Sequence, residues 1–434
     1  VSNHSRFNLT NSALVAIDPK TREIIAMVGS KGYDEDGGKF NVATANRQPG
    51  SSIKPLVYAT ALEKGYTAST VFWDLPTNFG SDSFPYEPVN YDDKYRGAVQ
   101  FRYALANSLN IPAVKALKIV GLDTFVRKLP SYGVRSVSRN GNFGLSLALG
   151  GAEVPLLQMT NAFGVFANGG QYQDTKSILA ITDKSGKSLP VQNSKKTQAI
   201  DPDVAYVITN VLSDNNARLQ AFGPGNLLQI DPHQLAVKTG TTNDIRDNWA
   251  IGYSNDIVIG VWSGNNDNTP MAAGISSGVT GATPIWNRAI KTFLNDLEPN
   301  EFAKPESIET EFVGTLTGYL PLKDIEGVRE EVYVQGTKPT TQSPWRTKLE
   351  ICKRDGKVAN SACKKDDYTE LKTFIRPIAL DEDWQKQVER AARDYYGSND
   401  DLKKYFKVPD ESEYKKGDKK KDDDDGDDDD DDDN

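Results

Sequence analysis

Histidine is scarce in this chain of 434 residues, which has only His4 and His233. His4 lies at the extreme start and His233 in a polar loop, so a catalytic relay of serine, histidine and aspartate is poorly supplied. A serine nucleophile in this chain would therefore need another base, and lysine is the alternative.

Cysteine is equally rare. Cys352 and Cys363 flank a polar segment that contains Asp355-Gly356, which is typical of hairpin turns, and opposite strand positions could bring the two sulfurs within bridging reach. An oxidising compartment would favour a disulfide between them, and two free thiols are the alternative. Two cysteines without a nearby histidine argue against a zinc site, and we expect neither a metal nor a cofactor.

Long apolar runs and an excess of basic charge are also missing. No run approaches the length that spans a bilayer, and no signal-peptide pattern opens the chain, whose first residue is not methionine. We expect this start to be a boundary cut into something longer. Residues 418–434 hold twelve aspartates and three lysines, which account for the whole net charge of −9. Nothing resembles a basic footprint for nucleic acid, and we expect no such partner.

Apolar periodicity predicts an α+β fold. Short β-branched runs predict strands at residues 11–18, 23–29, 234–242, 247–253 and 257–262. Helical spacing predicts helices at residues 51–63, 101–107, 113–129, 156–167, 201–212 and 281–294. The chain therefore predicts an antiparallel sheet that takes strands from both ends of a domain and is covered by helices, with a mostly helical subdomain inserted. Residues 67–100 predict a long loop, of the kind that walls a site or is mobile.

The first candidate site is Ser51-Ser52-Ile53-Lys54. Ser51 follows the turn residues Pro49-Gly50 and opens a helical pattern, so it lies near a helix N-terminus, where unpaired N–H groups favour negative charge. Lys54 points from the same face, and burial near another cation would let it accept a proton from the serine. A capping serine with a surface lysine is the alternative.

Two further motifs follow. Ser108 and Asn110 lie where one helical pattern ends and another restarts at Pro112, so they can project into one space; capping residues at an ordinary break are the alternative. Lys238-Thr239-Gly240 ends a short strand, and Gly240 lets the backbone approach a substrate closely.

In this order, Ser51-x-x-Lys54, Ser108-x-Asn110 and Lys238-Thr239-Gly240 resemble the motifs of the transpeptidase domain of a class A (bifunctional) penicillin-binding protein. The similarity covers about residues 10–295 and also rests on residues 47–52, 147–153, 238–244 and 261–267.

The resemblance implies a serine acyltransferase that cross-links peptidoglycan stem peptides ending in D-Ala-D-Ala through an acyl-enzyme on Ser51, and that β-lactams acylate. Lys54 would be the base, Ser108 would pass the proton to the leaving amine, and Asn110 would hold the substrate amide and orient Lys54. Class A members carry an upstream glycosyltransferase domain with a membrane anchor. The resemblance therefore places this domain in the bacterial cell envelope, on the extracytoplasmic side of the cytoplasmic membrane.

The Lys238 strand would complete the site. Lys238 adds positive charge opposite Lys54, which helps to keep one of the two lysines neutral. The family resemblance implies an oxyanion hole made by the N–H groups of Ser51 and Thr241. The hydroxyl groups of Thr239 and Thr241, with Lys238, suit a terminal carboxylate.

Two alternatives remain open. A D-Ala-D-Ala carboxypeptidase or β-lactamase-type hydrolase would transfer the acyl group to water, and class A β-lactamases do so with a glutamate in the pattern E-x-x-L-N. Glu153-Val154-Pro155-Leu156-Leu157 lacks the asparagine, so we predict slow deacylation. Glu153 is most simply a first-turn carboxylate that complements a helix dipole, and a water-activating base is the other interpretation. A penicillin-recognising sensor or scaffold is an alternative of another class.

We expect residues 1–300 to form the main domain, which the resemblance identifies as a transpeptidase, because the motifs are missing from the rest of the chain. Residues 301–400 predict a small β-rich region with strands near 331–336, 348–353 and 371–377 and a helix at 383–396. Residues 401–434 predict a disordered acidic tail, because they are charged and cannot bury a core.

Overall fold

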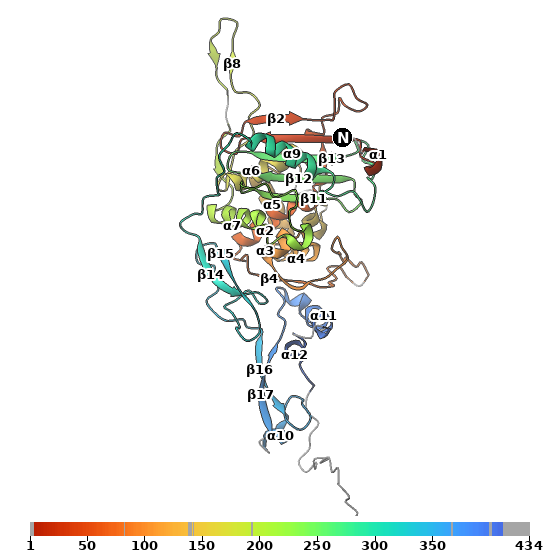
Figure 1. The fold of residues 1–434 in the computed structure, drawn as a ribbon, viewed down its shortest axis with the longest axis vertical. Helices are drawn as coiled ribbons and strands as arrows, with labels where there is room; N and C mark the ends of the chain where they lie inside the picture. Colours follow the sequence, from red (N-terminus) through yellow and green to blue (C-terminus); the bar gives the residue numbers. More distant parts are fainter. Residues whose placement is uncertain are drawn as a thin grey trace, which may run out of the picture. The chain divides into compact units, whose positions relative to one another are not determined.

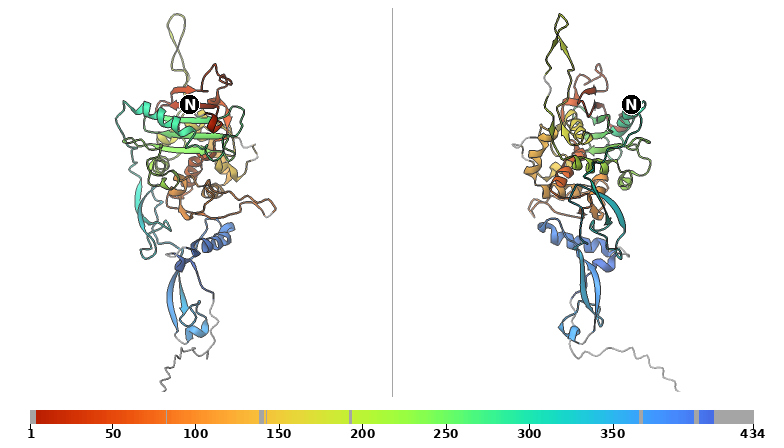
Figure 2. Two further views of the ribbon diagram at one scale, coloured as in Figure 1. Left: turned by 45° about the vertical axis from the view of Figure 1, so that its right-hand side comes forward. Right: turned by 90° about the vertical axis from the view of Figure 1, so that its left-hand side faces the viewer.

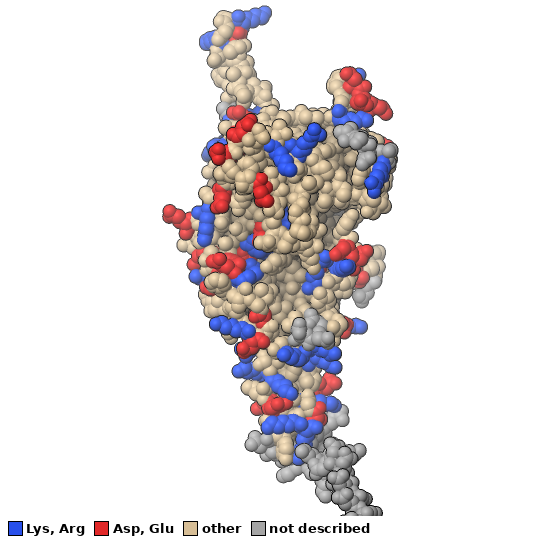
Figure 3. Space-filling view, in the orientation of Figure 1, with Lys and Arg blue, Asp and Glu red and all other residues tan. Residues whose placement is uncertain are grey.

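The computed structural model describes residues 4–81, 83–137, 141, 143–191, 194–365, 368–398 and 402–410 (Figure 1). These residues form two compact units. The larger unit runs to Ser343 and includes Ala379–Trp384, and the smaller unit takes Pro344–Ile378 and the residues from Gln385 onward. On the face of the larger unit shown in Figure 3, basic and acidic side chains are interspersed.

A five-stranded antiparallel sheet in the order β11-β12-β13-β1-β2 organises the larger unit. Its strands are β1 (Asn11–Ile17), β2 (Ile24–Val28), β11 (Ala236–Thr241), β12 (Asp247–Tyr253) and β13 (Val258–Gly264). Strand β1 pairs with β13 from Asn11 opposite Gly264 to Ile17 opposite Val258. Strands from both ends of the unit therefore share one sheet, which confirms the predicted arrangement.

Most helices of the larger unit lie between β2 and β11 in the chain. The helices are α1 (His4–Phe7), α2 (Lys54–Glu63), α3 (Phe101–Ala106), α4 (Asn110–Val120), α5 (Leu122–Lys128), α6 (Leu156–Ala167), α7 (Pro202–Ser213), α8 (Leu219–Phe222) and α9 (Ala282–Leu294). Nine of the ten residues of α2 are buried, as expected for a central helix that is apolar around its circumference.

Helices cover both faces of the sheet. Because alternate strand residues point to opposite faces, Ile251 and Trp262 join one apolar cluster while Ala250 and Val261 join the other. The first cluster contains residues of α2, α6 and α7, and the second contains Trp286 of α9. Figure 1 shows α9 and α2 on opposite sides of the strands. This double cover explains why every residue of β12 and β13 is buried.

Short strands and 3-10 turns complete the larger unit. The remaining strands before residue 200 are β3 (Asn46–Arg47), β4 (Val71–Asp74), β5 (Gly97–Gln100), β6 (Val154–Pro155), β7 (Gln171–Tyr172), β8 (Ile181–Thr182), β9 (Ser188–Leu189) and β10 (Thr197–Gln198). The 3-10 turns are η1 (Val42–Thr44), η2 (Gly50–Ile53), η3 (Leu129–Tyr132), η4 (Leu145–Leu149) and η5 (Glu382–Trp384). Figure 2 shows the β8–β9 hairpin projecting from the body of the unit.

Three local predictions need correction. Residues 67–100 are not one loop, because β4 near the start of this segment pairs with β5 at its end. The sequence did not predict β4, since its four residues are all buried and too few to show a period. The helix predicted at 113–129 is two helices, since Gly121 (φ +87°) ends α4 in a backbone conformation that glycine adopts readily. Helix α4 also begins at Asn110, so Pro112 is its third residue rather than its first.

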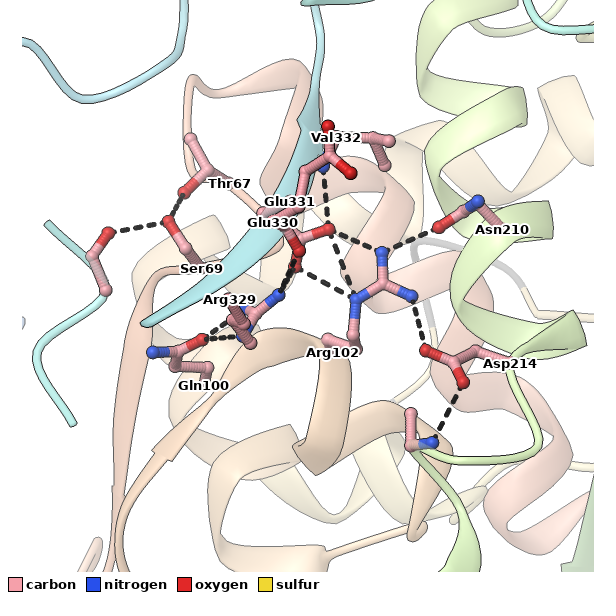
Figure 4. A network of polar contacts seen from close by, with 12 residues as sticks. Thr67, Ser69, Gln100, Arg102, Asn210, Asp214, Arg329, Glu330, Glu331 and Val332 are labelled. Atoms are coloured by element: carbon pink, nitrogen blue, oxygen red, sulfur yellow. Dashed lines mark hydrogen bonds and ion pairs between the residues drawn. The ribbon is translucent and has the colours of Figure 1, made fainter. Parts of the chain in front are cut away.

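A buried ionic network attaches a second hairpin to the helices of the larger unit (Figure 4). Strand β14 (Glu309–Gly314), which we did not predict, pairs with β15 (Val328–Tyr333), which begins before the predicted strand at 331–336. Glu331 is 1% exposed and accepts hydrogen bonds from Arg102 on α3, whose Nε lies 3.0 Å from Oε2. Arg329 Nη1 lies 2.8 Å from the same carboxylate, and Arg102 Nη1 lies 3.0 Å from Asp214 Oδ2 at the end of α7.

We expect Glu331→Gln to lower the free energy of unfolding by about 3 kcal/mol, because it leaves the buried guanidinium of Arg102 and the half-buried guanidinium of Arg329 without this carboxylate. Burial alone would raise the pKa of Glu331, but Arg102 and Arg329 outweigh burial and hold it below its ordinary value. The ionised form therefore stabilises the fold above the unfolded pKa, and that stabilisation disappears as the pH falls through the lowered folded pKa. Urea unfolding at several pH values should show the deficit at neutral pH and its decline in acid.

Glu330→Gln is the matched control, because Glu330 is the exposed neighbour on the same strand. It should change the free energy of unfolding by no more than about 0.5 kcal/mol. Equal effects of the two substitutions would contradict a stabilising role for the network.

The smaller unit contains β16 (Arg346–Cys352), β17 (Thr369–Ile375), α10 (Ser361–Lys365), α11 (Gln385–Gly397) and α12 (Lys403–Phe406). A disulfide joins Cys352 to Cys363, as predicted for an oxidising compartment. Cys363 lies on α10, however, so the bridge does not join two opposite strand positions.

The start of the predicted disordered tail has structure. Phe406 of α12 is buried and its ring stacks on Tyr396 of α11, with centroids 4.1 Å apart. The averaged composition of residues 401–434 concealed this one aromatic contact. Residues 411–434 lie outside the described part of the chain, and the division at residues 300 and 400 stays a prediction. None of the described helices has the length and apolar composition needed to cross a membrane.

Candidate active site

A cavity of about 530 Å³ brings the three motifs together. Of the eight site residues predicted from the sequence, those that line the cavity are Ser51, Ser108, Asn110, Thr239 and Thr241. The other three adjoin this lining, because Lys54 and Lys238 hydrogen-bond to Ser108 and Gly240 lies between Thr239 and Thr241. The structure therefore collects all eight residues in one place.

Ser51 lies on η2, a 3-10 turn that runs directly into α2. Gly50 has φ +53°, and a Cβ there would lie 2.5 Å from the carbonyl oxygen of Thr241. The neighbouring Ser52 is fully buried and donates its hydroxyl to Pro49 O at 2.7 Å, whereas Ser51 is half-buried and faces the cavity. The turn thus distinguishes two adjacent serines that the sequence pattern alone does not.

Lys54 is completely buried, so the alternative of a surface lysine is wrong. Its ammonium donates to Ser108 O at 2.6 Å, to Leu109 O at 3.0 Å and to Asn110 Oδ1 at 2.7 Å. Burial and then the charge of Lys238 lower the pKa of Lys54 well below its ordinary value, while Asp74 opposes them. The three oxygen acceptors also favour the protonated form, which places two opposing influences on one amine.

Ser108 connects the two lysines. It sits between α3 and α4 with φ +60°, and its hydroxyl accepts a hydrogen bond from Lys238 Nζ at 2.7 Å while its carbonyl accepts from Lys54. Lys238 is 2% exposed, and its pKa is lowered to about 7, first by burial and then by the nearby guanidinium of Arg218. Two amines with lowered pKa values therefore approach opposite ends of one serine.

Asn110 is the first residue of α4 and faces Lys54 with its side-chain oxygen. Its Nδ2 donates to Val89 O at 2.7 Å, and its backbone N–H donates to Asn90 Oδ1 at 2.8 Å. The predicted orientation of Lys54 by Asn110 agrees with this geometry. A contact between Asn110 and a substrate amide stays a prediction.

Strand β11 forms the opposite wall and is the edge of the sheet. A Cβ on Gly240 would lie 2.4 Å from Pro49 O, so the first requirement for glycine here is the close packing of β11 against the Ser51 turn. Our sequence argument attributed it only to substrate approach. Thr241 Oγ1 accepts a hydrogen bond from Gly278 N at 2.8 Å, which leaves the hydroxyl hydrogen available to the cavity.

Glu153 takes no part in this arrangement. It is exposed, it does not belong to the described lining of the cavity, and β6 separates it from α6, whose first turn holds no acidic residue. The interpretation of Glu153 as a first-turn carboxylate of α6 is therefore wrong.

Sequence reasoning missed several residues of the walls. Residues 89–93 and 96, residues 220–222 of α8 and residues 277–279 all line the cavity. The only available signal was the length of the segment at 67–100, which led us to expect a wall without naming its residues. Among the described residues, no group of three or more His, Cys, Asp or Glu side chains could hold a metal ion.

A family profile described as the penicillin-binding protein transpeptidase domain matches residues 12–281. The chain is 35% identical over 309 residues to penicillin-binding protein 1A of Neisseria meningitidis serogroup A, which covers 69% of this chain and 38% of that protein. It is 32% identical over 386 residues to penicillin-binding protein 1A of Clostridium botulinum, which covers 84% of this chain and 45% of that protein. The chain therefore spans less than half the length of these curated relatives.

Solved structures show the same fold. The crystal structure of penicillin-binding protein 1A from Haemophilus influenzae superposes with a TM-score of 0.69 and 30% identity, over 77% of this chain and 55% of that one. The PonA1 protein of Mycobacterium tuberculosis, in complex with penicillin V, gives a TM-score of 0.60 at 22% identity, over 71% of this chain and 83% of that one. The second similarity concerns the fold alone.

Proposed function

Because the chain belongs to the penicillin-binding protein transpeptidase family, we propose that it is a serine acyltransferase that cross-links peptidoglycan stem peptides ending in D-Ala-D-Ala. The observation that carries the proposal is the single cavity in which Ser51, Ser108 and Thr241 meet, with both buried lysines bonded to Ser108. β-Lactams would acylate the same serine.

In the first step, Ser51 Oγ attacks the substrate carbonyl and its proton passes to Lys54. A neutral amine has two hydrogens and one lone pair, so it can satisfy two of its three oxygen neighbours while its lone pair turns towards Ser51. Burial and Lys238 favour this neutral form, and the oxygens favour the ammonium that results. A base balanced in this way suits reversible proton transfer near neutral pH.

The negative charge on the tetrahedral intermediate would be held by the backbone N–H groups of Ser51 and Thr241, which both line the cavity. Loss of one such donor costs about 3–4 kcal/mol of activation free energy in comparable enzymes. The close packing of Gly50 and Gly240 around the turn supports this assignment, because it fixes the position of β11 relative to Ser51.

As the carbon–nitrogen bond of the tetrahedral intermediate breaks, Ser108 would give its hydroxyl proton to the leaving amine and would take in its place the proton that Lys54 received from Ser51. While Lys238 donates to Ser108 Oγ, the hydrogen of that hydroxyl is free to point into the cavity. The terminal carboxylate of the peptide would meet Lys238 and the hydroxyl groups of Thr239 and Thr241. A bound carboxylate would raise the pKa of Lys238 above its value of about 7, so substrate binding itself would favour the charged form.

We expect the acyl-enzyme to be long-lived when no acceptor amine is present. Glu153 is exposed and outside the described lining of the cavity, so it is badly placed to activate water. A fluorescent penicillin, followed by removal of free label and gel analysis, should stay on the protein throughout the chase. Rapid release of hydrolysed penicillin would contradict this and favour the β-lactamase-type alternative.

The decisive test of the proposal supplies a stem pentapeptide as donor and a second stem peptide as acceptor. The transpeptidase releases D-Ala and forms a cross-linked dimer that mass spectrometry detects. Release of D-Ala without the dimer would identify a carboxypeptidase. Acylation by penicillin with neither product would identify a sensor and overturn the enzymatic proposal.

We further propose an upstream glycosyltransferase domain with a membrane anchor and a location on the extracytoplasmic side of the cytoplasmic membrane of a bacterium. The greater length of the relatives supports the first part. The disulfide between Cys352 and Cys363 supports the second, because such bonds persist in oxidising compartments.

A further inference from the structure

A buried asparagine outside the three motifs hydrogen-bonds to the first residue of α4. Asn90 is 3% exposed, and its Oδ1 accepts the backbone N–H of Asn110 at 2.8 Å. Leu109, which precedes the helix, makes no side-chain cap, so Asn90 satisfies one of the donors that every helix start leaves unpaired. The carbonyl of the adjacent Val89 accepts Asn110 Nδ2 at 2.7 Å.

These contacts determine which way each amide faces. A carbonyl can only accept, so Val89 O requires the Asn110 nitrogen on its side and directs the Asn110 oxygen at Lys54. Asn90 Nδ2 lies 2.8 and 2.9 Å from the two carboxylate oxygens of Asp74 and 2.8 Å from Lys94 O. All three are acceptors, so the Asn90 oxygen must face Asn110.

Asp74 is a fully buried carboxylate at the end of β4. The charged and titratable groups that act on it or feel its charge are Lys54 and Tyr58 of α2, Lys115 of α4 and Arg96 before β5. Burial raises the pKa of Asp74 to about 6, and the hydrogen bond from Asn90 opposes that rise. A carboxylate buried at such cost needs hydrogen-bond donors, and here they are the Asn90 side chain and the backbone N–H of Arg96.

We propose that Asn90, oriented by the carboxylate of Asp74, is a positioning residue that holds the backbone N–H of Asn110 and so keeps the Asn110 side chain, whose amide Val89 O orients, in place against Lys54 for proton transfer. This inference rests on the proposed acylation of Ser51. The segment at 67–100 would then both line the cavity and help to position the catalytic lysine.

The test uses Asn90→Asp and the exchange variant D74N/N90D. In N90D two carboxylates face each other. A proton shared between them restores the hydrogen bond between positions 74 and 90, but this proton is lost as the pH rises. The exchange variant restores the bond between positions 74 and 90, because the amide at 74 donates to the carboxylate at 90, whose other oxygen accepts the Asn110 N–H. Only the bond to Lys94 O is given up. We expect N90D to be acylated by a fluorescent penicillin at least tenfold more slowly than the wild type at pH 8, with a deficit that shrinks towards pH 6. The exchange variant should recover to within about threefold.

Stopped-flow kinetics should place the N90D loss in the acylation rate constant and leave the dissociation constant of the non-covalent complex unchanged. Asn78→Asp is the matched control, because the Asn78 oxygen accepts the N–H groups of Gly80 and Tyr86 within the same segment and an aspartate can do the same. It should acylate like the wild type.

Acylation of the wild-type protein at Ser51 tests the proposed function separately. If the wild type is not acylated, the proposed function is wrong, and the role of Asn90 that rests on it falls as well. With wild-type labelling intact, a folded N90D acylating within twofold of the wild type at pH 8 would overturn the positioning role. If N90D does not fold, the exchange variant decides. A folded exchange variant that is acylated more than tenfold more slowly than the wild type would also overturn the positioning role.

Discussion

Ser51→Ala abolishes covalent labelling by a fluorescent penicillin, a loss of at least about a thousandfold, while the melting temperature stays within about 2 °C of the wild type. The reason lies in the two faces of η2. The Ser51 side chain is half-buried and points to the cavity, so its removal deletes the proposed nucleophile and little packing. In-gel fluorescence after denaturation measures the labelling, and differential scanning calorimetry measures the melting temperature.

Ser52→Ala supplies the control. The Ser52 hydroxyl is buried on Pro49 O, so its loss should cost about 1 kcal/mol of stability and leave the labelling in place. The two variants should thus have opposite outcomes. S51A loses the labelling and keeps its stability, whereas S52A loses stability and keeps the labelling. Labelling that survives in S51A would remove Ser51 as the nucleophile.

The sheet and the motif residues could be predicted because each is encoded locally. Strands β12 and β13 are short apolar runs separated by turn residues, and their burial on both faces leaves a continuous hydrophobic signal. The motif at Ser51 and Lys54 is likewise a spacing within one helical turn. Its convergence with Ser108 and Lys238 came from the family resemblance, because nothing local in the sequence joins residues so far apart.

The support of the site could not be predicted, because it depends on pairs distant in the chain. Arg102 and Glu331 are separated by 229 positions, and a sequence shows neither as buried. Asn90 and Asp74 lie among the polar residues of 67–100, where asparagine and aspartate ordinarily indicate a solvated turn. Only the folded chain shows that these two side chains are buried and fix the start of α4.

Glycine illustrates the same limit. Gly240 was predicted as the last residue of the Lys238-Thr239-Gly240 motif, but the atom that excludes a side chain is Pro49 O, 2.4 Å from where the Cβ would lie. Gly150 is similar, with φ +81° and a hypothetical Cβ 2.3 Å from Gly50 N. Close approaches of this kind between distant segments leave no periodic trace in the sequence.

Lys54→Gln should slow acylation by penicillin about 10²- to 10⁴-fold, the range that a general base contributes. Glutamine keeps two hydrogen-bond donors for the three oxygens around Lys54, but an amide does not accept a proton at neutral pH. The same change removes a buried amine whose charge burial and Lys238 disfavour, so we expect the protein to remain folded. The acylation rate of K54Q should also lack the rise with pH that the wild type shows as Lys54 loses its proton.

Lys64→Gln is the matched substitution at the opposite end of the same helix. Lys64 follows the last residue of α2 and also donates to backbone carbonyls, with Val120 O at 2.5 Å and Ile119 O at 3.4 Å. Lys64 is thus also a lysine that donates to carbonyl oxygens, but it lies outside the described lining of the cavity. K64Q should therefore be acylated at the wild-type rate with an unchanged pH profile. If K54Q instead acylates within tenfold of the wild type and keeps the rise with pH, another group accepts the proton of Ser51. Lys238, whose pKa of about 7 also suits a base, would then be the candidate.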